Sequence, residues 1–438
     1  MPQVSVAAPW FELEALNAAY HALLGTRTTV LRCVEGDVNT RESAFRVYAL
    51  EMHDEAWEAR PPWRWVERAE LDAVVLVAPE QRAWIARGFD DPAQPRLDSA
   101  GVSALWPPWA WPGWFARAES FVAAELARCG LAATAPIIQV RAWQRSCVLR
   151  ADTASGGAFF KASPRMFPHE AAVAGLLAAR YPDFFPEVLA IDRTEGWMVM
   201  RALEGHTLSE IPDLGRWEEA ARCLARFQFD CAAHVAELAR CGCPRWPLDR
   251  IADRLGPLLA DTDAMLIGTP EGLTEEEARE LRARLPALRN ACAQLAGVPV
   301  PESFEHGDLR GAHIIANGGG YRMFDLSDGA IAHPFYSAVS LLDYDRIPAA
   351  GGSHEAARIR LRDAYLSVWA PLAPMERLVS AFEQARVVAI LYAALLRYDV
   401  ILPAIQPREN WSFMIPYWLR KLLVALRERP DTVGSPWP

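Results

Sequence analysis

Two acidic residues in the C-terminal half of the chain, Asp308 and Asp325, have surroundings suited to phosphoryl transfer. Phosphoryl transfer needs a carboxylate near the acceptor hydroxyl and metal ligands that hold Mg²⁺ on the phosphates. Asp308 lies in the run Phe304-Glu305-His306-Gly307-Asp308-Leu309-Arg310-Gly311-Ala312-His313, and Asp325 lies in Met323-Phe324-Asp325-Leu326-Ser327-Asp328-Gly329. Short apolar strands flank each loop, so we expect the fold to bring both carboxylates to one cleft.

The run His306-Gly307-Asp308-Leu309 resembles the aminoglycoside phosphotransferases and their relatives, such as choline kinase and homoserine kinase. These enzymes share the protein-kinase-like fold, and the resemblance covers residues 136–398. It implies ATP and Mg²⁺ as cofactors, with a small-molecule acceptor. By the same resemblance Asp308 is the catalytic base or acceptor-orienting residue, and Asp325 is the principal metal ligand.

One position departs from the family pattern. The family places Asn five residues after the Asp, where this chain has His313. Imidazole is a poorer ligand for Mg²⁺ than an amide oxygen, because Mg²⁺ prefers oxygen donors. His313 could bind metal through water, favour Mn²⁺, or hydrogen-bond Asp308. Arg310 stands where protein kinases carry a lysine that neutralises the transferring phosphate. The alternative is an exposed arginine with no structural or catalytic role.

A kinase-like small lobe should also supply a lysine on a strand and a glutamate on the next helix, because this pair positions the α- and β-phosphates. Lys161 ends a strand pattern, and Glu170 begins the following helical run. Ser146 lies in the turn between two strands, where its hydroxyl could meet phosphate oxygens. An ordinary hairpin turn explains that segment equally well.

Two further segments are compared with the family pattern. The strand that contains Met198, Val199 and Met200 resembles the family hinge, where the backbone contacts adenine, although the two methionines would also suit a plain core. After Asp325 the family often has a supporting Asp, at a position that Ser337 occupies here. His306 precedes a tight Gly turn, and we expect it to hold the loop rather than to carry protons.

The resemblance implies an α+β, bilobal protein-kinase-like fold, and residues before it are expected to form a small α+β module. Residues 136–204 form the small lobe, with strand patterns at residues 137–141, 147–150, 158–161, 188–191 and 197–200 and a helix over residues 169–180. Residues 205–438 form the helical lobe with the catalytic loop, with helices expected over residues 217–237, 275–296 (Thr274 as N-cap), 355–369, 375–398 and 415–427. Residues 1–90 are the accessory module, which we expect to be non-catalytic, and residues 114–135 form a connecting helix. Residues 91–113 are a linker rich in Pro and Trp, without regular structure. Its tryptophans, including Trp106, Trp109 and Trp111, should pack on a neighbouring surface or, less simply, offer a stacking platform.

Composition limits the partners and the compartment. A formal net charge of −10 disfavours nucleic acid, which requires a basic face. The sequence has neither a signal-like start nor about 18 consecutive apolar residues, so we expect a cytoplasmic protein with no membrane partner. The eight scattered cysteines lack zinc-site spacing and are expected to be inert thiols. The oligomeric state is not indicated.

Two functions agree with these patterns. The first is an ATP-dependent kinase for a hydroxyl of a small molecule, such as an aminoglycoside-like compound, an amino alcohol or a sugar. Acidic residues beyond Asp325, among them Asp343, Asp345 and Glu355, would suit a cationic acceptor. The second is a nucleotide-binding pseudokinase that acts as a sensor or binds a partner. A protein kinase is disfavoured because no activation segment ending in Ala-Pro-Glu follows Asp325.

Overall fold

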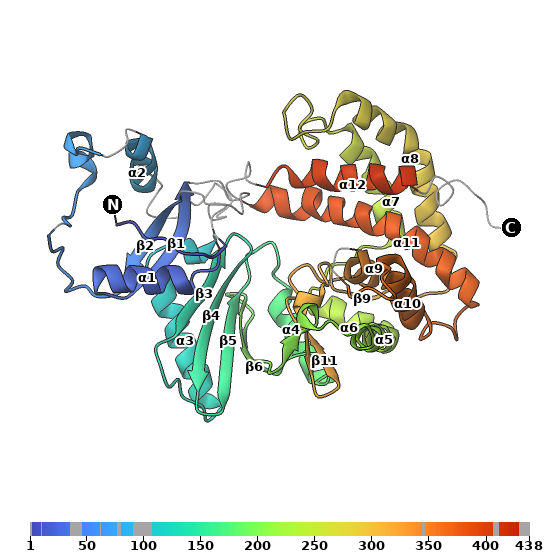
Figure 1. Ribbon diagram of the computed structural model, residues 1–438, viewed down its shortest axis with the longest axis horizontal. Coiled ribbons are helices and arrows are strands. Elements are labelled where there is room, and N and C mark those ends of the chain that lie inside the picture. Colours follow the sequence, from blue (N-terminus) through green and yellow to red (C-terminus); the bar gives the residue numbers. More distant parts are fainter. Residues whose placement is uncertain are drawn as a thin grey trace. The chain divides into compact units, whose positions relative to one another are not determined.

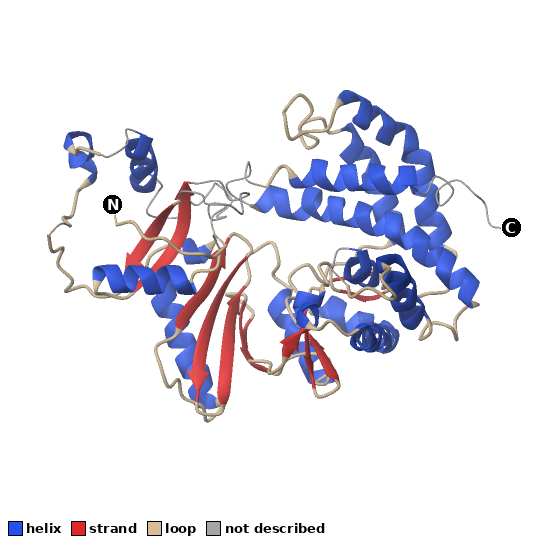
Figure 2. Ribbon diagram, in the orientation of Figure 1, coloured by secondary structure: helices blue, strands red, loops and turns tan. Residues whose placement is uncertain are grey.

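The computed structural model describes residues 2–9, 11–35, 46–61, 63–76, 80–90, 107–343, 347–405 and 411–428. The chain divides into two compact units. The first contains residues 1–165 and 197–200, and the second contains residues 166–196 and 201–438. Most of the predicted linker 91–113, with Trp106, lies outside the described residues, as does Asp345. Figures 1 and 2 show long strands in the first unit and mainly helices in the second.

An antiparallel sheet dominates the first unit. Strands β3 (Ile138–Trp143), β4 (Ser146–Thr153) and β5 (Gly156–Ala162) are consecutive neighbours, and β7 (Trp197–Arg201) follows β5. The register pairs Trp143 with Ser146 across the first hairpin and Val148 with Lys161 across the second. Strands were predicted from the sequence at residues 137–141, 147–150, 158–161 and 197–200, and all four are present.

Helix α3 (Trp114–Arg128) covers this sheet with an apolar stripe, and Gly130 follows it in the left-handed conformation, with φ of +70°. The helix expected over residues 114–135 is present, but it ends earlier, at Arg128. Trp114 and Phe121 make edge or tilted ring contacts with Phe160 and Trp197, with centroids 5.2–6.2 Å apart. Trp109 and Trp114 are buried. In the linker, Trp109 donates from Nε1 to the carbonyl oxygen of Trp143 on β3 and contacts the ring of Trp114. It lies in a short 3-10 helix, Pro108–Ala110, where no regular structure was expected.

The N-terminal residues belong to the same unit. Helix α1 (Glu14–Leu24) and the antiparallel pair β1 (Thr28–Glu35) and β2 (Val47–Met52) pack beside β3, and α2 (Glu80–Asp90) follows. Buried Gln139 on β3 accepts hydrogen bonds from Val30 N and Asn17 Nδ2, at 2.8 and 3.0 Å, and donates to Val30 O at 2.8 Å. One amide side chain thus continues the backbone pairing from β1 to β3.

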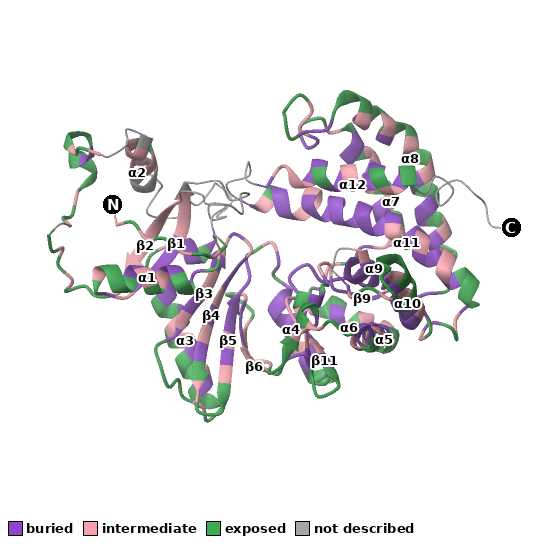
Figure 3. Ribbon diagram, in the orientation of Figure 1, coloured by how far each residue is buried: buried purple, intermediate pink, exposed green. Residues whose placement is uncertain are grey.

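The second unit begins with α4 (Glu170–Arg180) and β6 (Val188–Asp192), and most of its remaining residues are helical. Three helices match the sequence prediction closely: α8 (Glu275–Ala296), α11 (Met375–Leu396) and α12 (Met414–Glu428). Thr274 caps α8 in a capping box with Glu277, as its sequence predicts. Helix α11 is buried along nearly all of its length (Figure 3) and packs against α8, α9 and α12.

Other helices differ from the prediction. The single helix expected over residues 217–237 is divided into α5 (Leu214–Cys231) and α6 (Val235–Arg240) by a 3-10 turn. Helix α10 (His354–Leu366) ends three residues before the predicted Trp369. Helices α7 (Leu248–Ala260) and α9 (Phe335–Asp343) were not predicted.

Two small sheets interrupt the helices of the second unit. The order β11-β10-β8 joins Gly320–Met323, Ile314–Asn317 and His206–Thr207. The second sheet pairs β9 (Ser303–Glu305) with β12 (Ala330–Ala332) in antiparallel register. Strand β9 enters the Asp308 loop, and the Asp325 loop runs from β11 to β12.

Among the described residues, one helical stretch, Met375–Ala404, is long and apolar enough to span a membrane by length and composition alone. Of its most apolar window, 72% is buried inside the protein, as is usual for a core helix. The stretch contains α11, and its apolar side chains are therefore accounted for by packing.

Candidate active site

The Asp308 loop and the Asp325 loop pack directly against each other within the second unit. Gly307 has φ of +81°, and a Cβ built on it would lie 2.3 Å from the carbonyl oxygen of Asp328. A Cβ on Gly329 would lie 2.6 Å from the ring of Phe304. Only glycine fits at either position, because a side chain would separate the two loops. The expectation that the fold brings Asp308 and Asp325 to one place agrees with this packing.

Asp308 is partly exposed and forms an ion pair with Arg310, whose Nη2 lies 2.8 Å from Asp308 Oδ2. Both side chains keep contact with solvent, with 33% and 47% of their surfaces exposed. A carboxylate in this setting can accept a hydrogen bond from an acceptor hydroxyl. The adjacent guanidinium can approach a transferring phosphoryl group.

His313 connects the two loops. Its Nδ1 lies 2.7 Å from the carbonyl oxygen of Asp308, and its Nε2 lies 4.0 Å from Asp325 Oδ2. A carbonyl oxygen only accepts hydrogen bonds, so Nδ1 carries the proton in the neutral ring. Of the roles left open by the sequence, the structure shows the hydrogen bond to Asp308, which goes to its backbone carbonyl oxygen.

Asp325 adopts a left-handed backbone conformation, with φ of +66°. Such values are uncommon outside glycine, although Asp tolerates them better than most residues. The hydroxyl of Ser327, two residues later in the loop, donates to Asp325 Oδ1 at 3.3 Å. The unusual backbone angle turns the chain directly after β11 and presents the carboxylate beside His313.

His306 holds the base of this arrangement, as expected. Its Nε2 donates to the carbonyl oxygen of Phe324 at 2.9 Å, which joins the residue before Gly307 to the residue before Asp325. The ring is buried, and burial together with the nearby His313 lowers the His306 pKa to about 4. His306 is therefore neutral at pH 7 and acts as a structural hydrogen-bond donor.

Sequence reasoning missed a buried carboxylate at the start of the loop. Glu305 is 1% exposed, and its Oε1 accepts from the amide of Gly307 at 3.0 Å. Its Oε2 accepts from the hydroxyl of Ser337 on α9, and Ser337 Oγ in turn accepts from the His306 amide at 3.0 Å. The signal was present in the sequence, since an acid in a strand of otherwise buried residues must find partners.

His169, the residue before Glu170, joins helix α4 to the Asp325 loop. The ring is buried, and burial lowers its pKa, while the nearby backbone of Gly329 and Ser327 and the charge of Asp328 act in the opposite direction. Glu170 is the first residue of α4 and is fully buried. The start of α4 therefore lies close to the loop that carries Asp325.

The remaining predicted site residues lie in the first unit. Lys161 is buried near the end of β5. Ser146 is buried at the start of β4, and its hydroxyl accepts a hydrogen bond from Trp143 Nε1 at 2.9 Å, which is the ordinary hairpin alternative. The side chains of Met198 and Val199 on β7 are buried in the core, and Met200 is partly exposed.

The chemistry of the donor set agrees with a magnesium ion that arrives with phosphates. Among the described residues, no three His, Cys, Asp or Glu side chains gather closely enough to hold a metal alone. Magnesium bound to nucleotides typically takes one or two carboxylates, with phosphate and water oxygens completing the shell. Asp325 could supply such a carboxylate, and the nearest nitrogen of His313 lies 4.0 Å from it.

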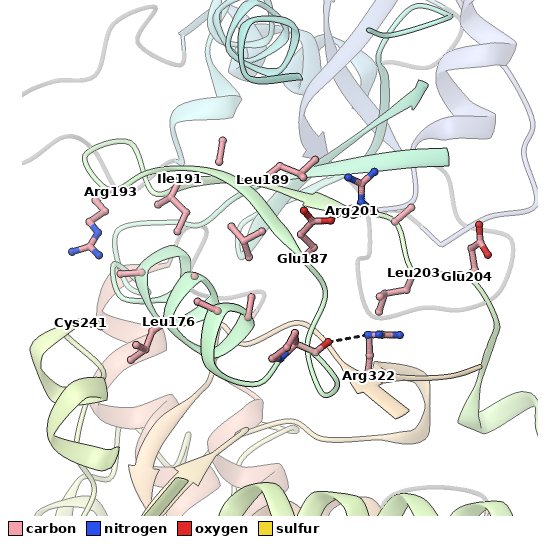
Figure 4. Close-up of a pocket in the computed structure, with 18 of the residues that line it drawn as sticks. Leu176, Glu187, Leu189, Ile191, Arg193, Arg201, Leu203, Glu204, Cys241 and Arg322 are labelled. Carbon is pink, nitrogen blue, oxygen red and sulfur yellow. Dashed lines mark hydrogen bonds and ion pairs between the residues drawn. The ribbon is translucent and has the colours of Figure 1, made fainter. Parts of the chain in front are cut away.

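A cavity of about 970 Å³ lies within the second unit, lined by one face of α4, by β6 and by residues 201–204 (Figure 4). At its rim Arg201 Nε donates to Glu187 Oε2 at 2.7 Å, and Arg322 Nε donates to the carbonyl oxygen of Pro182 at 3.2 Å. The lining residues do not include Asp308 or Asp325. The cavity is therefore separate from the two acids.

The acidic residues considered for a cationic acceptor give little support to that idea. Both carboxylate oxygens of Asp343 are bound by Arg386, at 2.8 and 3.0 Å. Glu355 is exposed in the first turn of α10. Asp343 is thus neutralised within the protein, and its charge gives no reason to prefer a cationic substrate.

Comparison with solved structures finds a choline/ethanolamine kinase family protein from Mesorhizobium loti, 16% identical, with a TM-score of 0.49. The match covers 72% of this chain and 97% of that one. Choline kinase from Cryptosporidium parvum Iowa II is 12% identical, with a TM-score of 0.49 over 67% of this chain and 90% of its own. Macrolide 2'-phosphotransferase type I is 15% identical, with a TM-score of 0.45 over 73% and 97%. At these values the similarities carry no conclusion about substrate.

No curated protein matches the chain. The model of the phosphotransferase enzyme family, in contrast, matches residues 135–375, which is more than half of the chain. This span agrees with the resemblance stated for residues 136–398 and contains Lys161, Glu170, Asp308, His313 and Asp325. The fold is mixed helix and sheet, as expected. The chain belongs to the phosphotransferase enzyme family.

Proposed function

We propose that this protein transfers the γ-phosphoryl group of ATP to a hydroxyl of a small molecule. One observation carries the proposal: the Asp308 loop and the Asp325 loop pack together, with His313 hydrogen-bonded to the first and 4.0 Å from the carboxylate of the second. A carboxylate for the acceptor and a carboxylate for the metal are the two groups that phosphoryl transfer needs.

In this proposal Asp308 accepts the hydrogen bond of the acceptor hydroxyl and orients its oxygen toward the phosphorus atom. Arg310, paired with Asp308 at 2.8 Å, stabilises the charge that develops on the transferred group. Asp325 and His313 would hold Mg²⁺ or Mn²⁺, and the bound ion would neutralise the charge of the phosphates. Lys161 and Glu170 would fix the α- and β-phosphates, and the backbone near Met200 would contact adenine.

Catalysis of this kind depends mainly on positioning, which the local structure favours. The glycines at 307 and 329 allow the loops to approach, and His306 ties the loops by a hydrogen bond to Phe324 O. The reacting groups then need little rearrangement when substrates bind. The acceptor remains to be identified within the classes of aminoglycoside-like compounds, amino alcohols and sugars.

The test is ADP release across a panel of those three classes, comparing the wild type with Asp308→Asn. Loss of the carboxylate should lower kcat by about 10²–10⁴-fold, the usual contribution of a positioned acid or base. Asp363→Asn is the matched control, because Asp363 is also partly exposed and also paired with an arginine at 2.8 Å. The Asp363→Asn protein should keep its turnover, and turnover that survives Asp308→Asn would contradict the proposal.

The second candidate is a nucleotide-binding pseudokinase, which the histidine at position 313 favours. A thermal-shift measurement with ATP and Mg²⁺ or Mn²⁺ separates it from the first. A nucleotide at 100 times its dissociation constant should stabilise the fold by about 2.7 kcal/mol. Binding without ADP release from any acceptor would favour the pseudokinase, and absence of binding would contradict both candidates.

A further inference from the structure

We propose that Glu305 is a positioning residue, whose buried carboxylate holds the backbone of the Asp308 loop in the geometry that transfer requires. This inference rests on the proposed function. It concerns a residue of the strand β9 that does not itself reach the substrate. The observations that carry it are a set of hydrogen bonds that join Glu305, Ser337 and two successive loop amides.

The carboxylate is used at both oxygens. Oε1 accepts from the Gly307 amide at 3.0 Å, and Oε2 accepts from the Ser337 hydroxyl. Ser337 Oγ also accepts from the His306 amide, at 3.0 Å. The two peptide N–H groups that immediately precede Asp308 are thus held, one directly and one through Ser337. A shift of either amide would move the Asp308 carboxylate.

The support around Ser337 is rigid and comes from elements distant in sequence. Gln228 on α5 donates from Nε2 to Ser337 Oγ at 3.3 Å and to the carbonyl oxygens of Phe304 and Pro334 at 3.0 Å. Its Oε1 accepts from the hydroxyl of Tyr365 at 2.6 Å. All of these polar groups are buried, so each depends on its partners.

Burial of Glu305 costs free energy of folding, because an apolar residue at this position of the strand would avoid the desolvation of a carboxylate. Its place directly before the Asp308 loop indicates that the carboxylate is kept for the loop. Burial raises the Glu305 pKa to about 7, even though hydrogen bonds from Ser337 and Gly307 favour the ionised form. The ionised carboxylate accepts from both donors at once, whereas protonation converts one oxygen into a donor. The loop should therefore be held best when Glu305 is ionised.

Other titratable groups around Glu305 do not supply a competing charge at neutral pH. His306, on the same loop, is neutral because burial lowers its pKa. Tyr336 on α9, Tyr365 on α10 and Tyr392 on α11 each interact electrostatically with Glu305, and burial raises their pKa values far above 10. Glu305 is thus the group of this cluster that changes charge near pH 7.

The first experiment compares Glu305→Gln with Glu302→Gln as the matched control, since Glu302 lies three residues earlier and is partly exposed beside Arg245. Glutamine keeps the shape of the side chain but replaces Oε2 with an NH₂ group, so that two hydrogen-bond donors face each other where the Ser337 hydroxyl now donates to Oε2. We expect kcat to fall about 10- to 100-fold in Glu305→Gln, as for a small misplacement of a reacting group, with the KM for nucleotide within about twofold of wild type. The limb of the kcat–pH profile near pH 7 should also disappear.

A second measurement does not depend on turnover. Hydrogen exchange of the full-length protein, followed in a peptide over residues 304–310, should show lost protection in Glu305→Gln and unchanged protection in Glu302→Gln. Protection elsewhere should stay unchanged. If the wild type turns over no acceptor, the proposed function fails, and this exchange result alone decides the role of Glu305.

A rescue variant completes the test. Glu305→Ala should lose both kcat and loop protection, and Glu305→Ala with Ser337→Asp should recover part of each, because the carboxylate then reaches the same His306 amide from α9. Unchanged kcat and unchanged protection in Glu305→Gln would overturn the inference. So would a loss of protection spread evenly over all peptides, since that would assign Glu305 to general stability.

Discussion

The Nε2 atom of His313 lies 4.0 Å from the Oδ2 atom of Asp325, and the proton of the ring is on the opposite nitrogen, which donates to Asp308 O. The imidazole therefore offers a lone pair beside the carboxylate. An amide side chain at this position would offer an oxygen instead. The choice between nitrogen and oxygen should decide which divalent ion supports activity.

We predict that His313→Asn shifts the metal preference toward Mg²⁺. Mg²⁺ prefers oxygen donors, whereas Mn²⁺ accepts imidazole more readily, so the ratio of kcat/KM with Mg²⁺ to that with Mn²⁺ should rise by about tenfold. The thermal shift with ADP and each metal gives a readout without turnover. His206→Asn is the control, because His206 is exposed on β8. An unchanged ratio in both measurements would exclude His313 from the metal shell.

We predict that Arg310→Gln lowers kcat by tenfold or more while stability changes by less than about 1 kcal/mol. The pair with Asp308 is partly exposed, and surface ion pairs contribute little to folding. A guanidinium that approaches the transferred phosphoryl group contributes far more to the rate. Arg362→Gln is the control, since Arg362 makes a comparable 2.8 Å pair with Asp363. Equal kcat in both variants would mean that Arg310 is an exposed arginine without a catalytic role.

The sequence predicted the site best where its residues are close along the chain. Asp308, Arg310 and His313 lie within one short loop, so their relative positions depend mainly on local sequence, and a local motif predicts them. Glu305 was missed because its partner Ser337 comes from a helix about 30 residues later, and a single strand does not reveal that contact. Its burial could be inferred only after α9 was placed.

The missed helices have a similar cause. Helix α9 is buried on every side, so its apolar residues show no helical period against a polar face. Helix α7 contains Pro257 in its interior, which argues against a helix when only local propensity is considered. Helix α8 was predicted well because its Thr274–Glu277 capping box is a local signal.

We predict that stability falls as the pH drops below about 6.5, and that His333→Asn weakens this dependence. Burial lowers the pKa of His333 to about 3 and that of His306 to about 4. The unfolded chain therefore binds protons first as the pH falls, which favours unfolding between about pH 6.5 and the lower folded values. The pKa of Glu305 is raised to about 7 in the folded state, so between its unfolded pKa and pH 7 a falling pH favours folding through this group. The two histidines together outweigh this single opposing group.

The measurement is the free energy of unfolding in urea at pH 7.5 and pH 5. For a histidine shifted this far, the loss between these values is about 2 kcal/mol. Asn keeps an acceptor for the Phe335 amide, which now donates to His333 Nδ1 at 3.3 Å. The variant should lose absolute stability through its smaller side chain, so the difference between the two pH values is the quantity that decides. If the change in unfolding free energy between pH 7.5 and pH 5 is the same in His333→Asn and in the wild type, then protonation of His333 does not contribute to the pH dependence.

We predict that Gln139→Leu destabilises the first unit by about 2–3 kcal/mol. The side chain satisfies both Val30 N and Val30 O, and leucine would leave these buried groups without partners. Gln144→Leu is the control, because Gln144 is also buried in the same region but its Oε1 accepts no hydrogen bond among the described residues. Urea unfolding with an unchanged m-value measures the difference. Since Val30 belongs to β1 and Gln139 to β3, a large effect would mean that residues 1–90 fold together with the sheet that carries Lys161. A Gln139→Leu protein as stable as the control would instead indicate that β1 packs on β3 without contributing to its stability.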